Sequence, residues 1–513
     1  MRRSTLPSAA TLADLAPIGT PVAARTLVRT ALPVVAGTFL RTALPVVAAI
    51  LALAVPPAAA SAQDAPTSPE RYRTLARELL RELVDINTTE SSGSETEAAR
   101  AMQRRLLDAG FPAGDLFVGG PVPDEHNLVA RLPGRDPSLK PLILLAHVDV
   151  VEADPADWST DIDPFRFMER EGFFYGRGTT DDKDEAAIYV ANLIRMKDEG
   201  FTPDRDILVA LTADEEGGGD NGVAWLLENH EGFADAAYAL NEGGGGMERG
   251  GVKVSNNVQA SEKKYLSFTF EATNPGGHSS LPRADNAIYD LSRALLAVSE
   301  SGFPVMLSEV QRAYFEGTAA ITGGSEGAAM RRLLEDPDDA AALAVLERIP
   351  AYNSRLRTTC VATQLAGGHA NNALPQRATA TVNCRILQEH PWGEVHARLQ
   401  ELAGPDVRVT PQGSGARMSP SSPLTDEVMG PIRRITEEMW PGTPVLPVMS
   451  TGATDALYLR GAGIPVYGVS GIFGDMDNTR AHGQDERIEA SHFFEGQEFL
   501  YRLAKALTSP GVS

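Results

Sequence analysis

The stretch PLILLAHVD, residues 141–149, decides the fold. It begins with a continuous apolar run, Pro141 to Ala146, and ends in a histidine and an aspartate. An uninterrupted apolar run of this length is typical of a strand buried on both faces of a parallel sheet. The stretch therefore predicts an α/β layer with polar side chains at the carboxyl end of one strand, where open α/β sheets bind their ligands.

Two further strands of the same kind follow along the chain. Ile207 to Leu211 repeats the apolar run, and so does Ala236 to Leu240. Helical stretches at 185–199 and 221–230 separate them, and two amphipathic helices at 71–83 and 95–109 precede the first strand. Strands that alternate with helices predict an α/β, doubly wound domain whose sheet is mainly parallel.

The pattern changes near residue 260, which predicts an inserted α+β domain. Lys264 to Ala272 alternates as a strand does, 286–299 is helical, and 356–365 and 378–387 are strands bounded by turns. Extra helices are expected within 327–346, and the α/β pattern resumes after residue 413. The expected organisation is a first domain in two pieces, 66–258 and 413–510, with the insert at 259–412 between them.

The amino-terminal residues predict export. An apolar run from Thr42 to Val55 is preceded by arginines and followed by Ala60-Ser61-Ala62, a small-x-small pattern that signal peptidases accept. We expect a signal peptide at 1–62 and a periplasmic or secreted protein with no stable membrane insertion after cleavage. A retained anchor is the alternative, which the short apolar run disfavours.

Composition excludes some classes of function. A chain of 513 residues predicts at least two domains, and 43% apolar with 22% charged residues is typical of a globular protein. A formal net charge of -22 argues against a nucleic-acid partner, which needs a positive field. The two cysteines, Cys360 and Cys384, provide no disulfide framework. They either pair across neighbouring strands or remain two buried thiols.

Acidic and imidazole side chains follow all three buried strands. The first strand ends in His147 and Asp149, the second in Glu215 and Glu216 after an aspartate, and the third in Glu242. A Gly-punctuated turn at 175–183 delivers a further carboxylate, Asp181, just before a helix, and His482 lies in a loop ahead of the last helix. Imidazole and carboxylate donors that converge in this way favour a site for divalent metal ions.

With these motifs the chain resembles the M20 family of co-catalytic zinc hydrolases, and most closely its carboxypeptidase S branch. The resemblance covers nearly the whole mature chain. It implies that Asp181 bridges two divalent metal ions, that His147 and Glu242 complete one site, and that Glu216 and His482 complete the other. This ligand mixture favours Zn²⁺, with Mn²⁺ and Co²⁺ as alternatives.

The resemblance also assigns roles around the metal ions. Glu215, next to the ligand Glu216, resembles the general base that takes a proton from the attacking water. Asp149 lies two residues after His147, on the same side of the strand, and is suited to accept the other N–H of that imidazole. In the family, the peptide bond after the bridging aspartate is cis, so Asp181–Asp182 is expected to be cis. Many members have glycine after the lysine of this motif, whereas Lys183 is followed here by two acids that open a helix.

The insert contains a second set of candidate residues. The motif GGHSSLP, residues 276–282, holds His278, which in the family supports the oxyanion in the active site of a partner subunit. This implies a homodimer that forms through the insert. Asn372 and Arg385 resemble residues that bind the carboxylate of the substrate, for which Arg offers a bidentate fork. Thr454, in the sequence Gly-Ala-Thr-Asp, resembles a substrate-side residue of the main domain.

Each assignment competes with a plainer interpretation. A lone His147 would usually be a satisfied strand-end histidine, and Glu215-Glu216 could be a solvated acidic turn. Arg385 could be a structural ion-pair partner. The position of the last ligand could be filled by another histidine, of which His492, His369 and His126 are the candidates. The sequence around His482, His-Gly-Gln-Asp-Glu, favours that residue.

Three functions are therefore compared. The first is an exported, metal-dependent hydrolase that cleaves an amide bond next to a free carboxylate, as a carboxypeptidase or dipeptidase acting on small peptides. The second is an N-acyl amino acid hydrolase with the same metal chemistry. The third belongs to another class, a periplasmic protein that binds metal or peptide without turnover and would have no need of Glu215.

Overall fold

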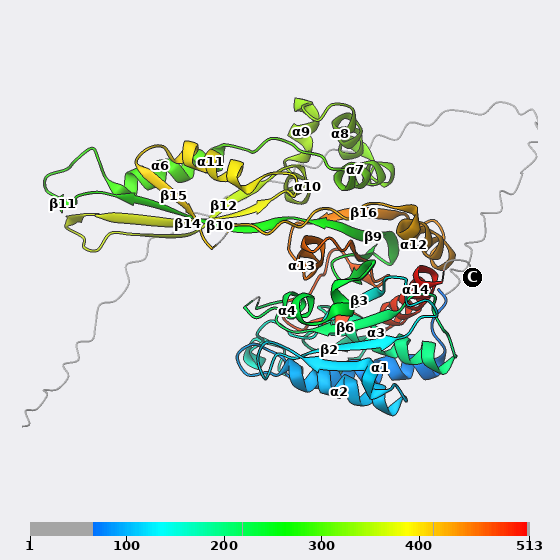
Figure 1. Ribbon diagram of the computed structural model, residues 1–513. Coiled ribbons are helices and arrows are strands. Elements are labelled where there is room, and N and C mark those ends of the chain that lie inside the picture. The colour runs from blue at the N-terminus through cyan, green and yellow to red at the C-terminus, as the bar shows by residue number, and fades with distance from the viewer. Residues whose placement is uncertain (1–64, 218, 414, 510–513) are drawn as a thin grey trace, which may run out of the picture. The chain divides into compact units, whose positions relative to one another are not determined.

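The computed structural model describes residues 65–217, 219–413 and 415–509, in which two sheets lie at the centre of two layered domains. The larger sheet has ten strands in the order β1-β2-β6-β3-β7-β17-β9-β8-β18, with β16 paired to β9 (Figure 1). The strands of this sheet are β1 (Leu116–Gly119), β2 (Asn127–Leu132), β3 (Leu142–His147), β6 (Ile207–Thr212), β7 (Tyr238–Asn241), β8 (Gly245–Arg249), β9 (Val252–Glu262), β16 (Val445–Ser450), β17 (Val466–Gly468) and β18 (Phe473–Asp475). The predicted signal peptide falls outside the described residues.

The three apolar runs of the sequence form the middle of this sheet. β3 pairs in parallel with β6 on one side and with β7 on the other, so the carboxyl ends of all three strands meet at one edge. All six residues of β3 and all six of β6 are buried, as expected for strands covered on both faces. The α/β class with a mainly parallel sheet is therefore confirmed.

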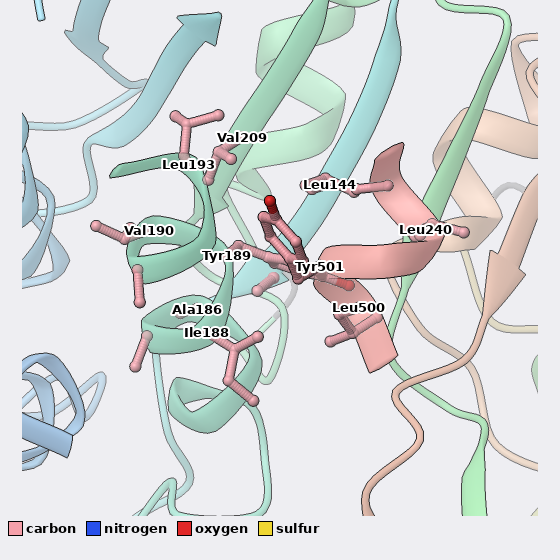
Figure 2. Packing of buried hydrophobic residues seen from close by; sticks show 14 of the residues in the cluster. Leu144, Ala186, Ile188, Tyr189, Val190, Leu193, Val209, Leu240, Leu500 and Tyr501 are labelled. Atoms are coloured by element: carbon pink, nitrogen blue, oxygen red, sulfur yellow. The ribbon is translucent and has the colours of Figure 1, made fainter. Parts of the chain in front are cut away.

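Helices cover both faces of the sheet. Leu144, Val209 and Leu240 point to one face, where they pack against α3 (Lys183–Asp198) and α14 (Ala490–Thr508), as Figure 2 shows. The helices on this face are α1 (Glu70–Asp85), α2 (Glu95–Asp108), α3, α12 (Asp426–Met439) and α14. The alternate strand residues pack on the other face against α4 (Gly222–Asn229), α5 (Glu231–Ala234) and α13 (Ala456–Gly461).

The insert is built on a four-stranded antiparallel sheet in the order β12-β14-β10-β15. These strands are β10 (Lys264–Thr273), β12 (Thr359–Gly367), β14 (Arg377–Ile386) and β15 (Val407–Pro411). One face packs on α6 (Ala287–Glu300) and α11 (Trp392–Ala403). Cys360 and Cys384 lie opposite each other on β12 and β14 and form a disulfide, which resolves the alternative that the sequence left open.

Four more helices of the insert form a small core of their own. They are α7 (Glu309–Ile321), α8 (Gly324–Glu335), α9 (Ala340–Leu346) and α10 (Pro350–Leu356). The alanine- and leucine-rich stretch predicted two of these helices, α8 and α9. Helices α7 and α10 were not predicted, because Gly317 interrupts α7 and α10 is a seven-residue helix with proline, serine and arginine.

The chain passes from one sheet to the other within a few residues. β9 ends at Glu262 in the large sheet, and β10 begins at Lys264 in the small one (Figure 1). The predicted boundary at residue 259 therefore lies within β9. Among the helices of the described residues, none has the length and hydropathy needed to span a membrane.

Candidate active site

The turn before α3 delivers the central carboxylate. Gly176 and Gly178 adopt φ values of 144° and 86°, and a Cβ atom on Gly176 would collide with the Val84 side chain. The chain then reaches Asp181, whose peptide bond to Asp182 is cis, as the resemblance implied. The glycines at 176 and 178 are therefore required by the backbone conformation of the turn.

Asp181 lies between two histidines that are far apart in the sequence. Its Oδ1 lies 2.9 Å from His147 Nε2, and its Oδ2 lies 2.9 Å from His482 Nε2. His147 is buried at the end of β3, whereas His482 sits on an exposed loop with a φ of 61°. A carboxylate that offers one oxygen to each side has the geometry of a ligand shared by two metal ions.

The remaining donors divide into two groups around this carboxylate. His147, Asp181 and Glu242 place one donor atom each within 4.8 Å of one another, and so do Asp181, Glu216 and His482. Glu216 Oε1 lies 2.6 Å from His482 Nε2. The five side chains that the sequence singled out are thus brought together by three strand ends, a turn and a distant loop.

Asp149 contacts two of the candidate ligands. Its carboxylate Oδ1 lies 3.4 Å from His147 Nδ1, and its Oδ2 accepts a hydrogen bond of 2.8 Å from the backbone N–H of Glu216. The backbone carbonyl of Asp149 also lies 3.1 Å from His147 Nδ1. Asp149 therefore orients both ligands, which is the arrangement expected around a metal-binding histidine.

The charges of the cluster fit divalent cations. Burial raises the pKa of Glu242 well above its ordinary value, and the negative charge of Asp181 adds to that shift. Burial would also raise the pKa of Asp181, but hydrogen bonds with His147 and His482 hold it below the usual range. Buried carboxylates that repel one another around two imidazoles are the donor set that Zn²⁺ and related ions neutralise.

Glu215 lies within the same cluster as His147 and Glu216. Burial raises its pKa to about 9, opposed by His147 and reinforced by the carboxylate of Asp455. Perturbed carboxyl groups of this kind are typical of acid–base sites.

A buried ion pair that the sequence analysis did not predict holds the Asp181 turn. Glu486 is fully buried, and its Oε2 accepts a hydrogen bond of 2.6 Å from Arg177. Its Oε1 accepts bonds from the backbone N–H of Thr180 at 2.9 Å and from the Thr180 hydroxyl at 3.0 Å. Glu486 follows His482 by four residues, so the loop of one candidate ligand clamps the turn of another.

A second buried network supports the loop of Glu215. Asp455 accepts hydrogen bonds from Thr212 Oγ1 at 2.9 Å and from Asn221 Nδ2 at 2.7 Å, at the two ends of that loop. Thr454 donates its backbone N–H and its hydroxyl to Glu262 Oε2, both at 3.1 Å. The buried Thr454 thus contacts Glu262 at the end of β9, and its predicted role in substrate binding remains a prediction.

Glu262 also connects the two crossings between the domains. Its Oε1 accepts a hydrogen bond of 3.2 Å from Ser419, on the returning segment, and lies 3.4 Å from Arg460 Nη1. Arg460 donates to Ser422 Oγ, on the same returning segment, at 3.1 Å. The side chains of Glu262 and Arg460 are each 1% exposed, so this is a buried ion pair.

The candidate residues of the insert lie on its own strands. His278, on β11 (Gly277–His278), pairs with Ala373 of β13 (Ala373–Leu374), next to Asn372. His278 is exposed, and its Nδ1 contacts Ser280 Oγ at 2.8 Å. Arg385 stacks over Tyr265, with its guanidinium carbon 4.8 Å from the ring centre. Among the described residues, no ion pair is formed by Arg385, so a structural ion pair does not account for it.

An open α/β sheet with imidazole and carboxylate donors at its carboxyl edge defines a class, the α/β proteins that can hold divalent metal ions. Comparison with known families makes the class specific. The chain belongs to peptidase family M20/M25/M40, whose family model matches residues 143–506. The protein is therefore a hydrolase that acts on peptide or amide bonds.

Three similar proteins illustrate the range of the family. Human N-fatty-acyl-amino acid synthase/hydrolase PM20D1 is 27% identical over 84% of this chain and 87% of its own length. A probable carboxypeptidase S-like 2 of Dictyostelium discoideum is 26% identical, over 78% of each chain. The crystal structure of an M20 family metallo-carboxypeptidase, Sso-CP2 of Sulfolobus solfataricus, shares the fold with a TM-score of 0.65 at 16% identity. That alignment covers 84% of this chain and 99% of the other.

Proposed function

We propose that this protein is an exported hydrolase that uses two metal ions to cleave an amide bond next to a free carboxylate, as a carboxypeptidase or dipeptidase does. The observation that carries the proposal is the pair of donor groups that share Asp181, with Glu215 beside them. The amino-terminal pattern at 1–62 supports export, and the mixture of imidazole and carboxylate donors favours Zn²⁺.

The residues of the chain divide the reaction between them. When bound, two divalent ions would lower the pKa of a shared water and polarise the scissile carbonyl. Glu215 takes a proton from the attacking water and holds it at its carboxylate, a task suited to a buried carboxyl group of raised pKa. The proton then passes to the nitrogen of the leaving amine. Asp149 keeps the His147 ring in one orientation through both steps.

Substrate binding falls to the insert in this proposal. Arg385 binds the free carboxylate of the substrate through its guanidinium fork. Asn372 lies beside His278, beyond the opposite end of β14, and would reach that carboxylate from the partner subunit. His278 donates a hydrogen bond to the developing oxyanion. His278 lies on the insert and is exposed, which supports a homodimer in which the insert of one subunit completes the site of its partner.

A second candidate substrate is an N-acyl amino acid. It is supported by the human relative, which is named as an N-fatty-acyl-amino acid synthase/hydrolase. An N-acyl amino acid has the same amide bond and the same carboxylate as a peptide, so the metal centre and Arg385 would serve either substrate. The two substrate classes differ only on the acyl side of the bond.

Incubation of the zinc-loaded mature chain with dipeptides and N-acyl amino acids, followed by mass spectrometry, tests the proposal. We expect release of a free amino acid, which a chelator abolishes and added Zn²⁺ restores. A protein that only binds metal or peptide would release no amino acid under either condition. Release that persists after complete removal of metal, verified by elemental analysis, would also contradict the proposed mechanism.

A further inference from the structure

An acidic cavity of about 660 Å³ lies next to the candidate metal centre. Its walls are four loops of the larger domain, at residues 89–95, 122–125, 149–152 and 214–217. Glu216 and Asp149 belong both to these walls and to the candidate active site. The cavity is thus continuous with the place where the amide bond would be cleaved, and it does not involve the insert.

All the charged residues that line this cavity are acidic. Eight of its described lining residues are Asp or Glu, and none is Lys, Arg or His. Six of the acids are Glu90, Glu95, Glu125, Asp149, Asp214 and Glu216. The two divalent ions of the proposed centre would be offset by Asp181, Glu215, Glu216 and Glu242. The other acids of the lining, among them Glu90, Glu95, Glu125 and Asp214, would have no such counter-charge.

Among the acids of this cavity, Glu95 is the most deeply buried one outside the candidate metal centre. It is 4% exposed, it lines the cavity, and no other described residue donates a hydrogen bond to its carboxylate. Burial, reinforced by the carboxylates of Asp149 and Glu125, raises its pKa to about 8. Oε2 of Glu125 is also buried without a hydrogen-bond partner. Buried carboxyl oxygens are normally paired, so the unpaired Oε2 of Glu125 and a buried Glu95 carboxyl group whose one hydrogen bond comes from its own backbone N–H need an explanation.

The cavity is held open by a set of hydrogen bonds. The Thr96 hydroxyl donates to the Pro123 carbonyl at 2.8 Å, and the backbone N–H of Thr96 donates to the Asp124 carbonyl at 3.0 Å. The Thr88 hydroxyl donates to the Val148 carbonyl at 2.7 Å, and the Glu216 N–H donates to Asp149. Each wall is therefore tied to another, and the acids keep their positions without a bound group.

The spacing of the acids favours an organic cation over a third metal ion. Within the described residues, the groups of His, Cys, Asp and Glu whose donor atoms lie within 4.8 Å of one another all belong to the metal centre. Glu90, Glu95 and Glu125 form no such group, so they are too far apart to share one ion. An ammonium or guanidinium group on a flexible chain, with donors that point in several directions, suits separated carboxylates.

We propose that this cavity binds a positively charged group on the acyl half of the substrate, next to the scissile bond, with Glu95 and Glu125 as its partners. The inference rests on the proposed amide-hydrolase function and narrows its substrate class. The substrate carries a cation on one side of the amide bond and a carboxylate on the other. A free peptide has both charges, whereas an N-acyl amino acid with an uncharged acyl chain lacks the first.

Matched substrates test the inference on the unaltered protein. Alanyl-leucine and propionyl-leucine have the same skeleton and differ by the α-ammonium group. Lysyl-leucine and norleucyl-leucine differ by the side-chain ammonium group. We expect kcat/KM to be roughly tenfold or more higher for the charged member of at least one pair, as for a hydrogen bond to a buried charged group. The pair that shows the preference identifies which cation the cavity binds.

Variants connect the preference to the cavity. Glu95→Gln and Glu125→Gln should each reduce the preference several-fold and leave hydrolysis of the uncharged substrate in place. Glu97→Gln is the matched control, because Glu97 lies in the same turn of α2 but is exposed and does not line the cavity. Its preference should equal that of the unaltered protein.

The two proposals fail in different ways. If leucine is released equally fast from the charged and uncharged members of both pairs, the cavity inference is wrong and the amide-hydrolase function stands. A preference that survives in both Glu95→Gln and Glu125→Gln also overturns the assignment of the cavity. If none of the four substrates releases leucine, the proposed function itself fails.

Discussion

The candidate metal centre and the His278 ribbon of the insert, residues 276–282 with 372–375, differ in how their side chains are held. At the metal centre, Asp149 orients His147 and Glu486 clamps the turn that carries Asp181. In the ribbon, the described hydrogen bonds of the His278 side chain all go to its neighbour Ser280, and Leu281 is 73% exposed. The candidate ligands are held by other side chains of the same chain, whereas both residues of β11 in the ribbon are exposed.

The difference follows from where each site is built. Three donors of the candidate metal centre follow buried parallel strands, where the packing of the sheet fixes the backbone, and Glu486 holds the turn of Asp181. The ribbon is a separate two-stranded sheet of two-residue strands, and both residues of β11 are exposed. A substitution in the first region should therefore affect chemistry or stability within one chain. A substitution in the second should act between chains.

The largest effect is expected for Glu215→Gln. The amide keeps the size of the side chain but cannot take a proton, so kcat should fall by up to 10⁴-fold, about 5.5 kcal/mol. Metal content, measured by elemental analysis, should be unchanged, because the five assigned ligands remain. Glu228→Gln, at an exposed position of α4, is the control and should keep full activity. An active Glu215→Gln protein would falsify the assignment of the base.

The sequence predicted the centre of the molecule better than its periphery. The strands β3, β6 and β7 were predicted from their apolar runs, because a strand that is buried on both faces needs apolar residues throughout. β9 and β16 were missed because asparagine, glutamine and proline interrupt their apolar pattern. The edge strand β1 was missed as well, since it is short and only partly buried, and so was its neighbour β2.

The same distinction applies to the site. The candidate ligands stand in motifs next to strands and turns, so the sequence was sufficient to predict that they form one site. Glu486 and Asp455 were not assigned, although both are buried and hydrogen-bonded to the site loops. Glu262 lies in an ordinary polar stretch, Ser-Glu-Lys-Lys. The role of a supporting residue depends on what it contacts in the fold, which the sequence does not show. Of these three residues, only Glu486 stood in a motif that was singled out, His-Gly-Gln-Asp-Glu.

The next largest effect is expected for Glu262→Ala, which tests the support of the catalytic-domain loops. The change leaves Arg460 buried without its partner and removes two hydrogen bonds from Thr454. We expect the free energy of unfolding to fall by about 3–5 kcal/mol, measured with denaturant. Glu438→Ala is the control, because its pair with Arg434 is solvent-exposed and should contribute less than about 1 kcal/mol. Equal losses for the two variants would mean that the buried pair is no more important than a surface pair.

His278→Ala probes the other side of the comparison. Loss of one oxyanion donor should lower kcat roughly 10²-fold, with metal content and thermal unfolding unchanged, because the side chain is exposed. Mixing His278→Ala with Glu215→Gln should restore part of the activity. A mixed dimer has one site with both an intact base and an intact histidine. If subunit exchange is demonstrated and no activity returns, His278 does not act across subunits.

We expect the smallest effect on folding for Leu365→Lys on β12. This variant is also the most direct test of the difference between the two regions. This edge strand has no charged residue or proline, and Val361 and Leu365 are 58% and 69% exposed. Isolated edges of this kind invite pairing with another chain, and a lysine is a common protection against it. The free energy of unfolding should change by less than about 0.5 kcal/mol, while light scattering shows the mass to fall from dimer to monomer. Ile321→Lys, at an exposed position of α7, should leave the mass unchanged.

The activity of that monomer decides what the exposed ribbon is for. If His278 acts across the dimer, the Leu365→Lys monomer should lose about as much activity as His278→Ala, although its metal centre is intact. Both variants would then remove the same donor, one by truncation and the other by separation of the subunits, and the double variant should be no worse than either alone. A fully active monomer would mean that the oxyanion donor comes from the same chain, and the contrast between a complete and an incomplete site would disappear.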